Sequence, residues 1–235
     1  MNGRSVLLLA EPGGTEDDAP NILERLAPAD RLLVEQAGKV SRYAAGQTLF
    51  AQGAPHHGIF IIRSGLIRSF YVSDAGREIT LAFWRAGHFV GGPQIFGGGQ
   101  HMWTSVAVAP SECILLPGAR LAQLSREIPE LAHALIEGLV HKGRCYCALL
   151  QLLATKSMRR RLALLLQLLA RPAPEHPEWS AVGGEFSHGE LASMIGSTRQ
   201  WVSLMLARFE REGWVERDAA GRPVRVRVGL PSRVA

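Results

Sequence analysis

The chain has 235 residues, of which 47% are hydrophobic and 20% charged, a balance typical of a globular protein with one or two cores and not of a disordered chain. The formal net charge is +5, and residues 1–154 carry equal numbers of acidic and basic side chains, so the excess lies in residues 155–235. A neutral first part and a basic second part indicate two domains, the second suited to a polyanion such as nucleic acid. The alternative is that the five excess positive charges only solvate the protein surface, which explains them equally well.

The three cysteines, Cys113, Cys145 and Cys147, are too few and too unevenly spaced for a disulfide framework, which favours a reducing compartment. No apolar run approaches the roughly 20 residues that cross a bilayer. The apolar stretch at residues 6–10 is too short for the core of a signal peptide. We therefore expect a cytoplasmic protein that begins with a flexible extension over residues 1–20.

The segment after this extension has the two-residue period of β-strands. Runs rich in β-branched and aromatic residues lie at 58–63, 66–72, 78–84, 104–109 and 113–116. Glycines that permit tight turns separate these runs. Many short strands at this spacing predict a closed β-roll or sandwich within residues 21–128.

A long helix is expected over residues 129–155. It starts at Pro129, contains no internal proline, and its apolar residues return every three or four positions. The helix has a second apolar row at Leu135, Leu149 and Leu152, so its apolar surface is larger than one sheet face can cover. We therefore expect a partner helix from a second copy of the chain, and hence a homodimer. The alternative is a helix packed wholly within its own chain.

A helix at about 157–170 and a proline-rich loop at 171–177 lead to a compact last module. Ser187 and Glu190 have the spacing of a capping box, so a helix begins there and ends by Gly196. Ser197 and Gln200 form a second box, which opens a longer helix that runs to about residue 212. Two helices joined by a tight glycine turn predict a helix-turn-helix.

The second of these helices has one apolar and one open face. At about 100° per residue, Val202, Leu206 and Phe209 fall on the face that packs inward. In such motifs the N-terminal residues of the second helix enter the major groove, where arginine pairs with guanine and glutamine with adenine. We therefore expect base or phosphate contacts from Thr198, Arg199, Gln200 and Ser203.

A basic hairpin is expected after this helix. A strand starts at Trp214, residues 218–221 can turn, and residues 224–228 alternate strictly, which puts Arg225 and Arg227 on one face and three valines on the other. Such a hairpin is a wing able to touch phosphates. The alternative is a solvent-exposed edge strand whose charged residues only prevent it from pairing with other chains. Residues 156–235 thus predict a winged helix-turn-helix DNA-binding domain.

These features together resemble the Crp/Fnr family of bacterial transcription regulators, the cyclic-AMP receptor protein superfamily, over about residues 20–230. The resemblance rests on residues 46–53, 58–65, 74–81, 87–91 and 190–202. It implies an α+β protein with an N-terminal cyclic-nucleotide-binding-like β-roll (jelly roll), a long central dimerisation helix and a C-terminal winged helix-turn-helix. It also implies that an effector in the roll and central helix controls binding to double-stranded DNA at an inverted repeat, with RNA polymerase as a further partner.

The sequence departs from the cyclic-nucleotide binders of that family in the phosphate-binding cassette. The family pattern has a glutamate where this chain has glycine, and its Arg-Ser or Arg-Thr pair matches Trp103 and Thr104 here; no arginine lies between Arg85 and Arg120. A buried phosphate without a guanidinium loses a charge-assisted bidentate pair. We therefore expect an effector other than cyclic AMP, in a pocket shaped by Phe89, Gly91, Gly92, Trp103, Thr104, Tyr146 and Cys147, unless these side chains simply fill the cavity.

The sequence does not single out one cofactor. The chain lacks the N-terminal cysteine cluster of the iron–sulfur members, so we expect no such cluster, whereas His88, His101 or a cysteine can serve as an axial ligand of haem. Cys145 and Cys147 point about 200° apart on a helix, so they cannot share a metal within one chain but can oxidise across a dimer. The alternatives are a haem- or redox-sensing regulator of this fold, or a ligand-binding scaffold without DNA binding. No nucleophile, base or metal set indicates an enzyme.

Overall fold

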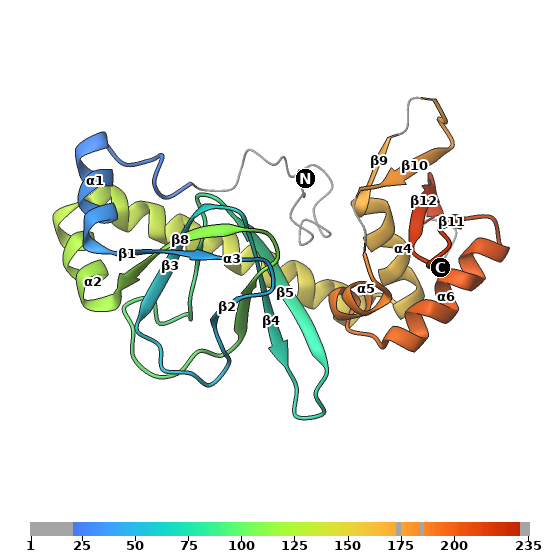
Figure 1. Ribbon diagram of the computed structural model, residues 1–235, viewed down its shortest axis with the longest axis horizontal. Coiled ribbons are helices and arrows are strands. Elements are labelled where there is room, and N and C mark those ends of the chain that lie inside the picture. Colours follow the sequence, from blue (N-terminus) through green and yellow to red (C-terminus); the bar gives the residue numbers. More distant parts are fainter. Residues whose placement is uncertain (1–20, 173–174, 184–185, 231–235) are drawn as a thin grey trace. The chain divides into compact units, whose positions relative to one another are not determined.

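The computed structural model describes residues 21–172, 175–183 and 186–230. Among them, one compact unit comprises residues 21–76 and 81–146, and is called the N-terminal unit below. The second, the C-terminal unit, comprises residues 77–80 and the described residues from Cys147 onward. Figure 1 shows the order of the elements, coloured along the chain from blue to red.

The N-terminal unit is built on two four-stranded sheets (Figure 1). One has the order β1-β8-β3-β6 and consists of β1 Lys39–Tyr43, β8 Ser111–Pro117, β3 Gly58–Ser64 and β6 Phe89–Val90. The other has the order β2-β7-β4-β5 and consists of β2 Thr48–Phe50, β7 Thr104–Ala107, β4 Leu66–Val72 and β5 Glu78–Arg85. Strands β3 and β8 pair antiparallel, with Phe60 opposite Leu115. Apart from β4 and β5, which follow one another along the chain, neighbouring strands are distant in sequence, as a roll of crossing connections requires.

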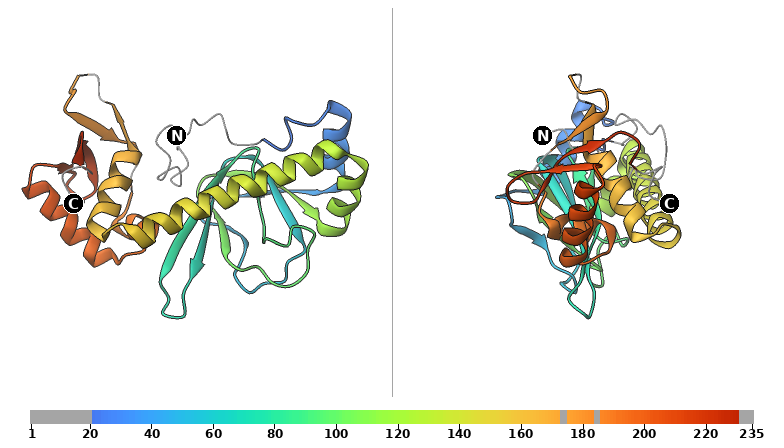
Figure 2. Two further views of the ribbon diagram at one scale, coloured as in Figure 1. Left: turned by 180° about the vertical axis from the view of Figure 1, so that it is seen from behind. Right: turned by 90° about the vertical axis from the view of Figure 1, so that its right-hand side faces the viewer.

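Three helices cover the first sheet and share a core with it. They are α1 Pro28–Ala37, α2 Gly118–Glu127 and α3 Pro129–Thr155. Within the N-terminal unit, α3 runs along the roll (Figure 2). The shared core joins the sheet side chains Ile59, Ile61, Ile114 and Leu116 to helix side chains that include Val34, Leu121, Leu124, Leu131 and Leu135.

Helix α3 has one buried and one exposed apolar face. The buried row contains Leu135, Lys142 and Leu149, which follow one another at intervals of seven residues. Ile136, Val140 and Leu150 lie on the other side and are 59%, 50% and 66% exposed. A single chain therefore leaves an apolar stripe of α3 uncovered.

The C-terminal unit packs three further helices against a small sheet. The helices are α4 Met158–Leu169, α5 His188–Ile195 and α6 Arg199–Arg211. The sheet has the order β11-β12-β10-β9, formed by β11 Val215–Arg217, β12 Pro223–Arg227, β10 Trp179–Val182 and β9 Ala170–Pro172.

The expected fold class is confirmed: a roll, a long helix and a helix-turn-helix with a small sheet follow one another along the chain. The strands β1, β2 and β6 were not predicted, because they are short and the first two are largely exposed.

The loop predicted at 171–177 is wrong at its start, where β9 includes Pro172. A proline fits there because β9 is an edge strand. The extension predicted at 1–20 lies outside the described residues, as do residues 173–174 of that loop.

Among the described residues, no helix combines the length and the apolar character that crossing a bilayer requires.

Candidate nucleic-acid interface and effector site

The first helix of the helix-turn-helix begins where the capping-box spacing predicted. The Ser187 hydroxyl accepts a hydrogen bond from the amide of Glu190 at 3.2 Å, and the Ser187 amide donates to the Glu190 carboxylate at 2.7 Å. Two amides that the helix itself leaves free are thereby satisfied. The helix ends at Gly196, which adopts the left-handed conformation (φ +67°) that glycine tolerates best.

Arg161 of α4 holds this helix end in place. Its guanidinium donates to the carbonyls of Lys156 at 2.9 Å and of Ile195, the last residue of α5, at 3.2 Å, and it also donates to the carbonyl of Leu153. Carbonyls at a helix C-terminus lack partners within the helix, and a cation is favourable there. One side chain thus ties the end of α3 to the turn of the helix-turn-helix.

The second helix, α6, is capped one residue later than predicted. The hydroxyl of Thr198 accepts from the amide of Trp201 at 3.2 Å, whereas the hydroxyl of Ser197 is buried without a hydrogen-bond partner among the described residues. The predicted box from Ser197 to Gln200 is therefore wrong. The left-handed Gly196 turns the chain so that Ser197 points inward and Thr198 takes the cap position.

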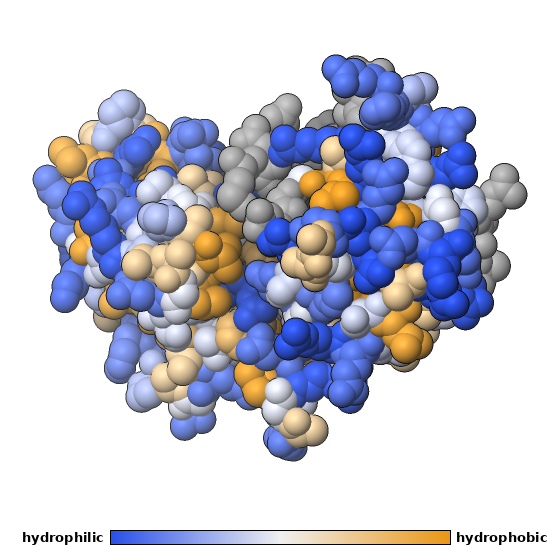
Figure 3. Space-filling view, turned by 45° about the vertical axis from the view of Figure 1, so that its right-hand side comes forward, coloured by the Kyte–Doolittle hydropathy of each residue, from blue (hydrophilic) through white to orange (hydrophobic). Residues whose placement is uncertain are grey.

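The two faces of α6 are distributed as the sequence predicted. Val202, Leu206 and Phe209 are fully buried, together with Met205. Thr198, Arg199 and Gln200 are exposed and Ser203 is half-buried. No described residue forms a hydrogen bond or ion pair with the side chain of Arg199 or Gln200. The start of α6 thus offers free polar groups on one open face, and hydrophilic residues dominate the surface of the C-terminal unit in Figure 3.

The predicted wing is present as the hairpin of β11 and β12. Its turn is organised by Asp218, whose carboxylate accepts from the amides of Ala220 at 2.9 Å and Arg222 at 2.8 Å. Only Val226 of the three valines is buried, while Val224 and Val228 are exposed.

The arginines of the wing are paired with carboxylates. Arg225 contacts Glu216 at 3.4 Å, and Arg227 contacts Glu178 at 2.6 Å. Arg217 pairs with Glu210, and Arg222 pairs with Asp218 at 2.7 Å. Exposed pairs of this kind contribute roughly 0–1 kcal/mol each, so a phosphate can replace the carboxylate at little cost. Among the described residues of this surface, Arg199 has no carboxylate partner, whereas these four arginines are paired.

The residues expected to form the effector pocket do not all meet. Phe89 is buried against α3, where a Cβ on Gly138 would lie 2.7 Å from its ring. The ring centroids of Trp103 and Tyr146 are 6.0 Å apart. Thr104 points elsewhere and accepts from the amide of Gln52 at 3.0 Å. Cys147 is exposed, so it does not join Phe89 and Tyr146. Of the two cysteines on α3, Cys145 is the buried one.

Gly91 and Gly92 lie beside a pair of buried histidines. The amide of Gly92 donates to Nε2 of His56 at 2.7 Å, and the His56 ring lies 4.3 Å from that of His101. His101 in turn stacks on Phe50 at 3.8 Å. Burial lowers the pKa of His56 and lowers that of His101 to about 4. Two neutral imidazoles therefore fill the space beside the glycines.

A buried lysine lies at the centre of a second cluster, which the sequence prediction missed. Lys142 is 8% exposed, and its ammonium nitrogen lies 3.5 Å from the ring centroid of Trp84 and 4.6 Å from that of Phe89. His88 and His141 flank the same tryptophan, at 5.8 and 6.3 Å between ring centroids. The seven-residue spacing of Leu135, Lys142 and Leu149 was the signal that could have placed this lysine in the buried row.

The cluster around Lys142 has shifted protonation equilibria. Burial lowers the pKa of Lys142 to about 7 and that of His88 to about 3. Burial, with the charge of Lys142, also lowers the pKa of His141, and burial raises that of the Cys145 thiol to about 11. Lys142 is therefore the group of this cluster that changes charge near neutral pH.

Two of the candidate haem ligands, His88 and His101, lie in closely packed surroundings. His88 lines a cavity of about 10 Å³, the size of one water molecule, together with Trp84, Phe89 and Lys142. His101 is stacked face to face on Phe50. Within the described part of the chain, no group of three or more His, Cys, Asp or Glu side chains is placed to hold a metal ion.

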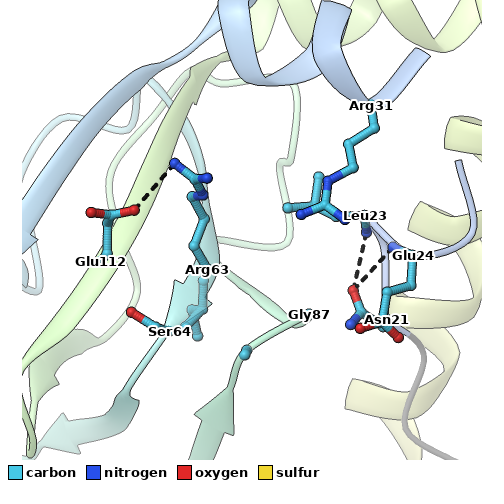
Figure 4. Close-up of a pocket in the computed structure, with 10 residues that line it drawn as sticks. Asn21, Leu23, Glu24, Arg31, Arg63, Ser64, Gly87 and Glu112 are labelled. Carbon is cyan, nitrogen blue, oxygen red and sulfur yellow. Dashed lines mark hydrogen bonds and ion pairs between the residues drawn. The ribbon is translucent and has the colours of Figure 1, made fainter. Parts of the chain in front are cut away.

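A larger cavity, of about 270 Å³, opens at another place in the N-terminal unit (Figure 4). Arg63 faces this cavity and pairs with Glu112 at 3.1 Å, while Asn21 binds the amides of Leu23 and Glu24. Arg31, at the upper side, pairs with Glu35 at 3.1 Å. None of the expected effector residues lines this cavity, and its arginines already have carboxylate partners.

Two family models match the chain. Residues 40–127 match the cyclic nucleotide-binding domain, and residues 160–227 match the Crp-like helix-turn-helix domain. The first covers the roll, and the second covers the region from α4 to β12.

Curated relatives and a solved structure agree with these matches. The chain is 30% identical to the cyclic AMP receptor protein of Thermus thermophilus over 175 residues, which are 74% of this chain and 77% of that protein. It is 29% identical to the transcriptional activator protein FnrA of Stutzerimonas stutzeri over 184 residues, 77% of this chain and 73% of that one. The c-di-GMP responsive global regulator CLP of Xanthomonas campestris has a similar fold, with a TM-score of 0.75 at 20% identity, over 84% of this chain and 98% of that chain.

Proposed function

This chain belongs to the Crp/Fnr family of DNA-binding transcriptional regulators, and we propose that it binds an inverted-repeat operator as a homodimer under the control of an effector other than cyclic AMP. Members of the family are transcription factors and not enzymes. The proposed partners are double-stranded DNA, a second copy of the chain and RNA polymerase, in the cytoplasm where the DNA is.

The open start of α6 carries the proposal. Arg199 and Gln200 are exposed, have no partner among the described residues, and stand at the N-terminus of a helix whose opposite face is buried. The N-terminus of a helix carries a partial positive charge that favours phosphate. A guanidinium and an amide at this place match the donor and acceptor edges of guanine and adenine in the major groove.

Replacing Arg199 with alanine is expected to weaken binding to the operator by about 1–3 kcal/mol, because one bidentate contact with a guanine is lost. Binding to random DNA should change far less, so the ratio of specific to non-specific affinity should fall. Gel-shift titrations of operator and random duplexes at one salt concentration measure both.

Arg211→Ala is the matched control for this change. Arg211 lies on the same helix, is exposed, and stands at its C-terminal end, away from the residues expected to enter the groove. It removes the same charge from the same helix. If Arg199→Ala and Arg211→Ala weaken operator and random DNA equally, Arg199 does not read a base.

The uncovered stripe of α3 supports the homodimer. Ile136, Val140 and Leu150 are exposed and follow the three-and-four spacing of a helix seam. Pairing of two such stripes about a twofold axis would bury them. Two recognition helices related by that axis reach successive major grooves, so we expect half-sites centred about 10–11 base pairs apart.

The wing is proposed to contact phosphates. Arg225→Ala should weaken operator and random DNA alike and reduce the slope of log K against log salt by about 0.9, the value expected for one phosphate contact. Arg42→Ala is the control, because Arg42 forms a comparable surface pair with Glu112 in the N-terminal unit. An unchanged salt slope for Arg225→Ala would argue against a phosphate-contacting wing.

An effector other than cyclic AMP is supported by the environment of Gly92. Its amide is already bound by His56, and the neighbouring His101 fills the space beyond it. No arginine lies between Arg85 and Arg120 to pair with a buried phosphate. A phosphate placed here would have to displace an imidazole and would still lack a guanidinium, and an unpaired buried charge is costly.

A further inference from the structure

Leu204 is an apolar side chain on the open face of α6. It is 72% exposed, more than any other large hydrophobic side chain of the described residues. The two residues that follow it, Met205 and Leu206, are buried. Single exposed leucines are common on protein surfaces, so the exposure of Leu204 is informative only through its position.

This position lies on the same face of α6 as Gln200. Residues four apart on a helix are separated by about 40° around its axis, so Leu204 stands one turn beyond Gln200 and nearly in line with it. Two small side chains, Ser203 and Ala207, flank Leu204 on this face and are half-buried. The leucine therefore projects beyond its neighbours on the side of the helix opposite the core.

Leu204 also lies within the part of α6 that reaches bases in a helix-turn-helix. Arg199 is the first residue of α6, and Leu204 follows five residues later, about 7.5 Å further along the axis. Base pairs stack about 3.4 Å apart, so this span covers about two base-pair steps. The first two turns of a recognition helix are the ones that contact base edges. Leu204 thus falls opposite a base pair in the half-site that Arg199 contacts.

The chemistry of leucine restricts which base it can contact favourably. Its side chain neither donates nor accepts a hydrogen bond, so it cannot pair with the polar edges of guanine, adenine or cytosine. Covering those edges without supplying a partner costs free energy. Thymine alone presents an apolar group in the major groove, the methyl group on C5.

We propose that Leu204 determines specificity for a thymine in each half-site, by packing against the C5 methyl group of that base. The inference rests on the proposed function, because it names a base that the helix-turn-helix reads. The contact is uncharged, so it adds discrimination between sequences without adding to the salt dependence of binding.

The test uses the full-length protein and a duplex that it selects from a random pool. Each thymine of the selected half-site is replaced in turn by deoxyuridine, which lacks only the methyl group, at the equivalent position of both half-sites. Binding is measured by gel-shift titration at one salt concentration. At one position the replacement should weaken binding about fourfold per half-site, the effect of removing one buried methyl group.

Three variants assign this effect to Leu204. Leu204→Ala should bind the thymine and deoxyuridine duplexes with equal affinity. Leu204→Met keeps an apolar side chain of similar size, so it should retain most of the discrimination. Leu32→Ala is the matched control, because it makes the same change at an exposed leucine of α1 and should discriminate as wild type does. Circular dichroism verifies that each variant is folded.

The outcomes separate this inference from the proposed function. Failure to select any duplex refutes the operator binding on which the inference rests. A selected duplex with no thymine whose methyl group matters leaves operator binding standing and overturns the role of Leu204. An equal methyl effect in wild type and Leu204→Ala also overturns it, because another side chain would then make the contact.

Discussion

Replacing Phe209 with alanine is expected to unfold the helix-turn-helix and abolish operator binding. Phe209 is fully buried on the inner face of α6, beside Leu206 and Val202, and the guanidinium of Arg159 lies 5.6 Å from its ring centroid. Removing a buried phenylalanine costs about 3–5 kcal/mol, from lost burial and from the cavity left behind. This cost rivals the total stability of a small unit.

The measurement is a pair of thermal unfolding curves followed by a gel shift. Leu204→Ala is the matched control, because Leu204 lies on the same helix and is 72% exposed. It should leave the unfolding curve within about 0.5 kcal/mol of wild type, as surface changes generally do. Equal stability of Phe209→Ala and Leu204→Ala would mean that α6 does not pack through this face.

The second large effect is a gain in stability on replacing Lys142 with methionine. The lysine is buried without a counter-ion, and methionine has a similar length, fills the same space and needs none. Replacing buried charge with apolar side chains stabilises proteins by about 1–4 kcal/mol in favourable cases. The contacts with two aromatic rings offset part of the gain. We expect a clear rise in Tm at pH 7.

The gain should depend on pH in a defined direction. The folded-state pKa of Lys142 is about 7, below the ordinary value of 10.5, so between these values the unfolded chain binds more protons than the folded one. Wild-type stability therefore rises with pH over this window as far as this group is concerned. The variant lacks the group. The excess stability of the Lys142→Met variant over wild type is therefore greatest at pH 7. It decreases by at most about 1.4 kcal/mol per pH unit above pH 7.

The useful range for this measurement is pH 7–9. His88 and His141 have lowered pKa values and stay neutral throughout it. The pKa values of Cys145 and Tyr146 are raised by burial, so both stay protonated in the folded state. Denaturant unfolding at several pH values isolates the contribution of Lys142 when Lys39→Met, which removes an exposed lysine of β1, is measured alongside as the control. An advantage that stays constant from pH 7 to 9 would contradict a buried ammonium with a depressed pKa.

A lysine that lowers stability inside the N-terminal unit is informative about function. Strongly perturbed ionisable groups gather at sites where proteins bind or react. Removing such a group commonly raises stability and lowers function.

The DNA-reading elements were predictable from the sequence because their signals are local. The capping box of Ser187 and Glu190 joins residues three apart, and the inner face of α6 follows from the helical period of Val202, Leu206 and Phe209. The cap of α6 was predicted one residue early, because the inward turn of Ser197 depends on the left-handed Gly196 and on the packing around it. Helix ends are generally the least certain part of such predictions.

The effector region was predictable only in part. Tyr146 contacts the rings of both Trp84 and Trp103, whereas Cys147 is exposed and Thr104 binds Gln52. His56 and Lys142 were missed. The hydrogen bond between His56 and Gly92 joins residues 36 positions apart in the sequence. No local sequence pattern predicts a contact between residues so far apart.

By itself, the sequence determined the order of roll, long helix and helix-turn-helix, and which residues of α6 face inward and outward. These properties depend on the spacing of neighbouring residues along one element, which periodicity records. The tertiary structure alone decided which charges stand free. It pairs Arg227 with Glu178, 49 residues away, leaves Arg199 without a partner among the described residues, and encloses Lys142 between two rings with no carboxylate. Charge pairing and burial depend on chain segments distant in sequence, and only folding brings those together.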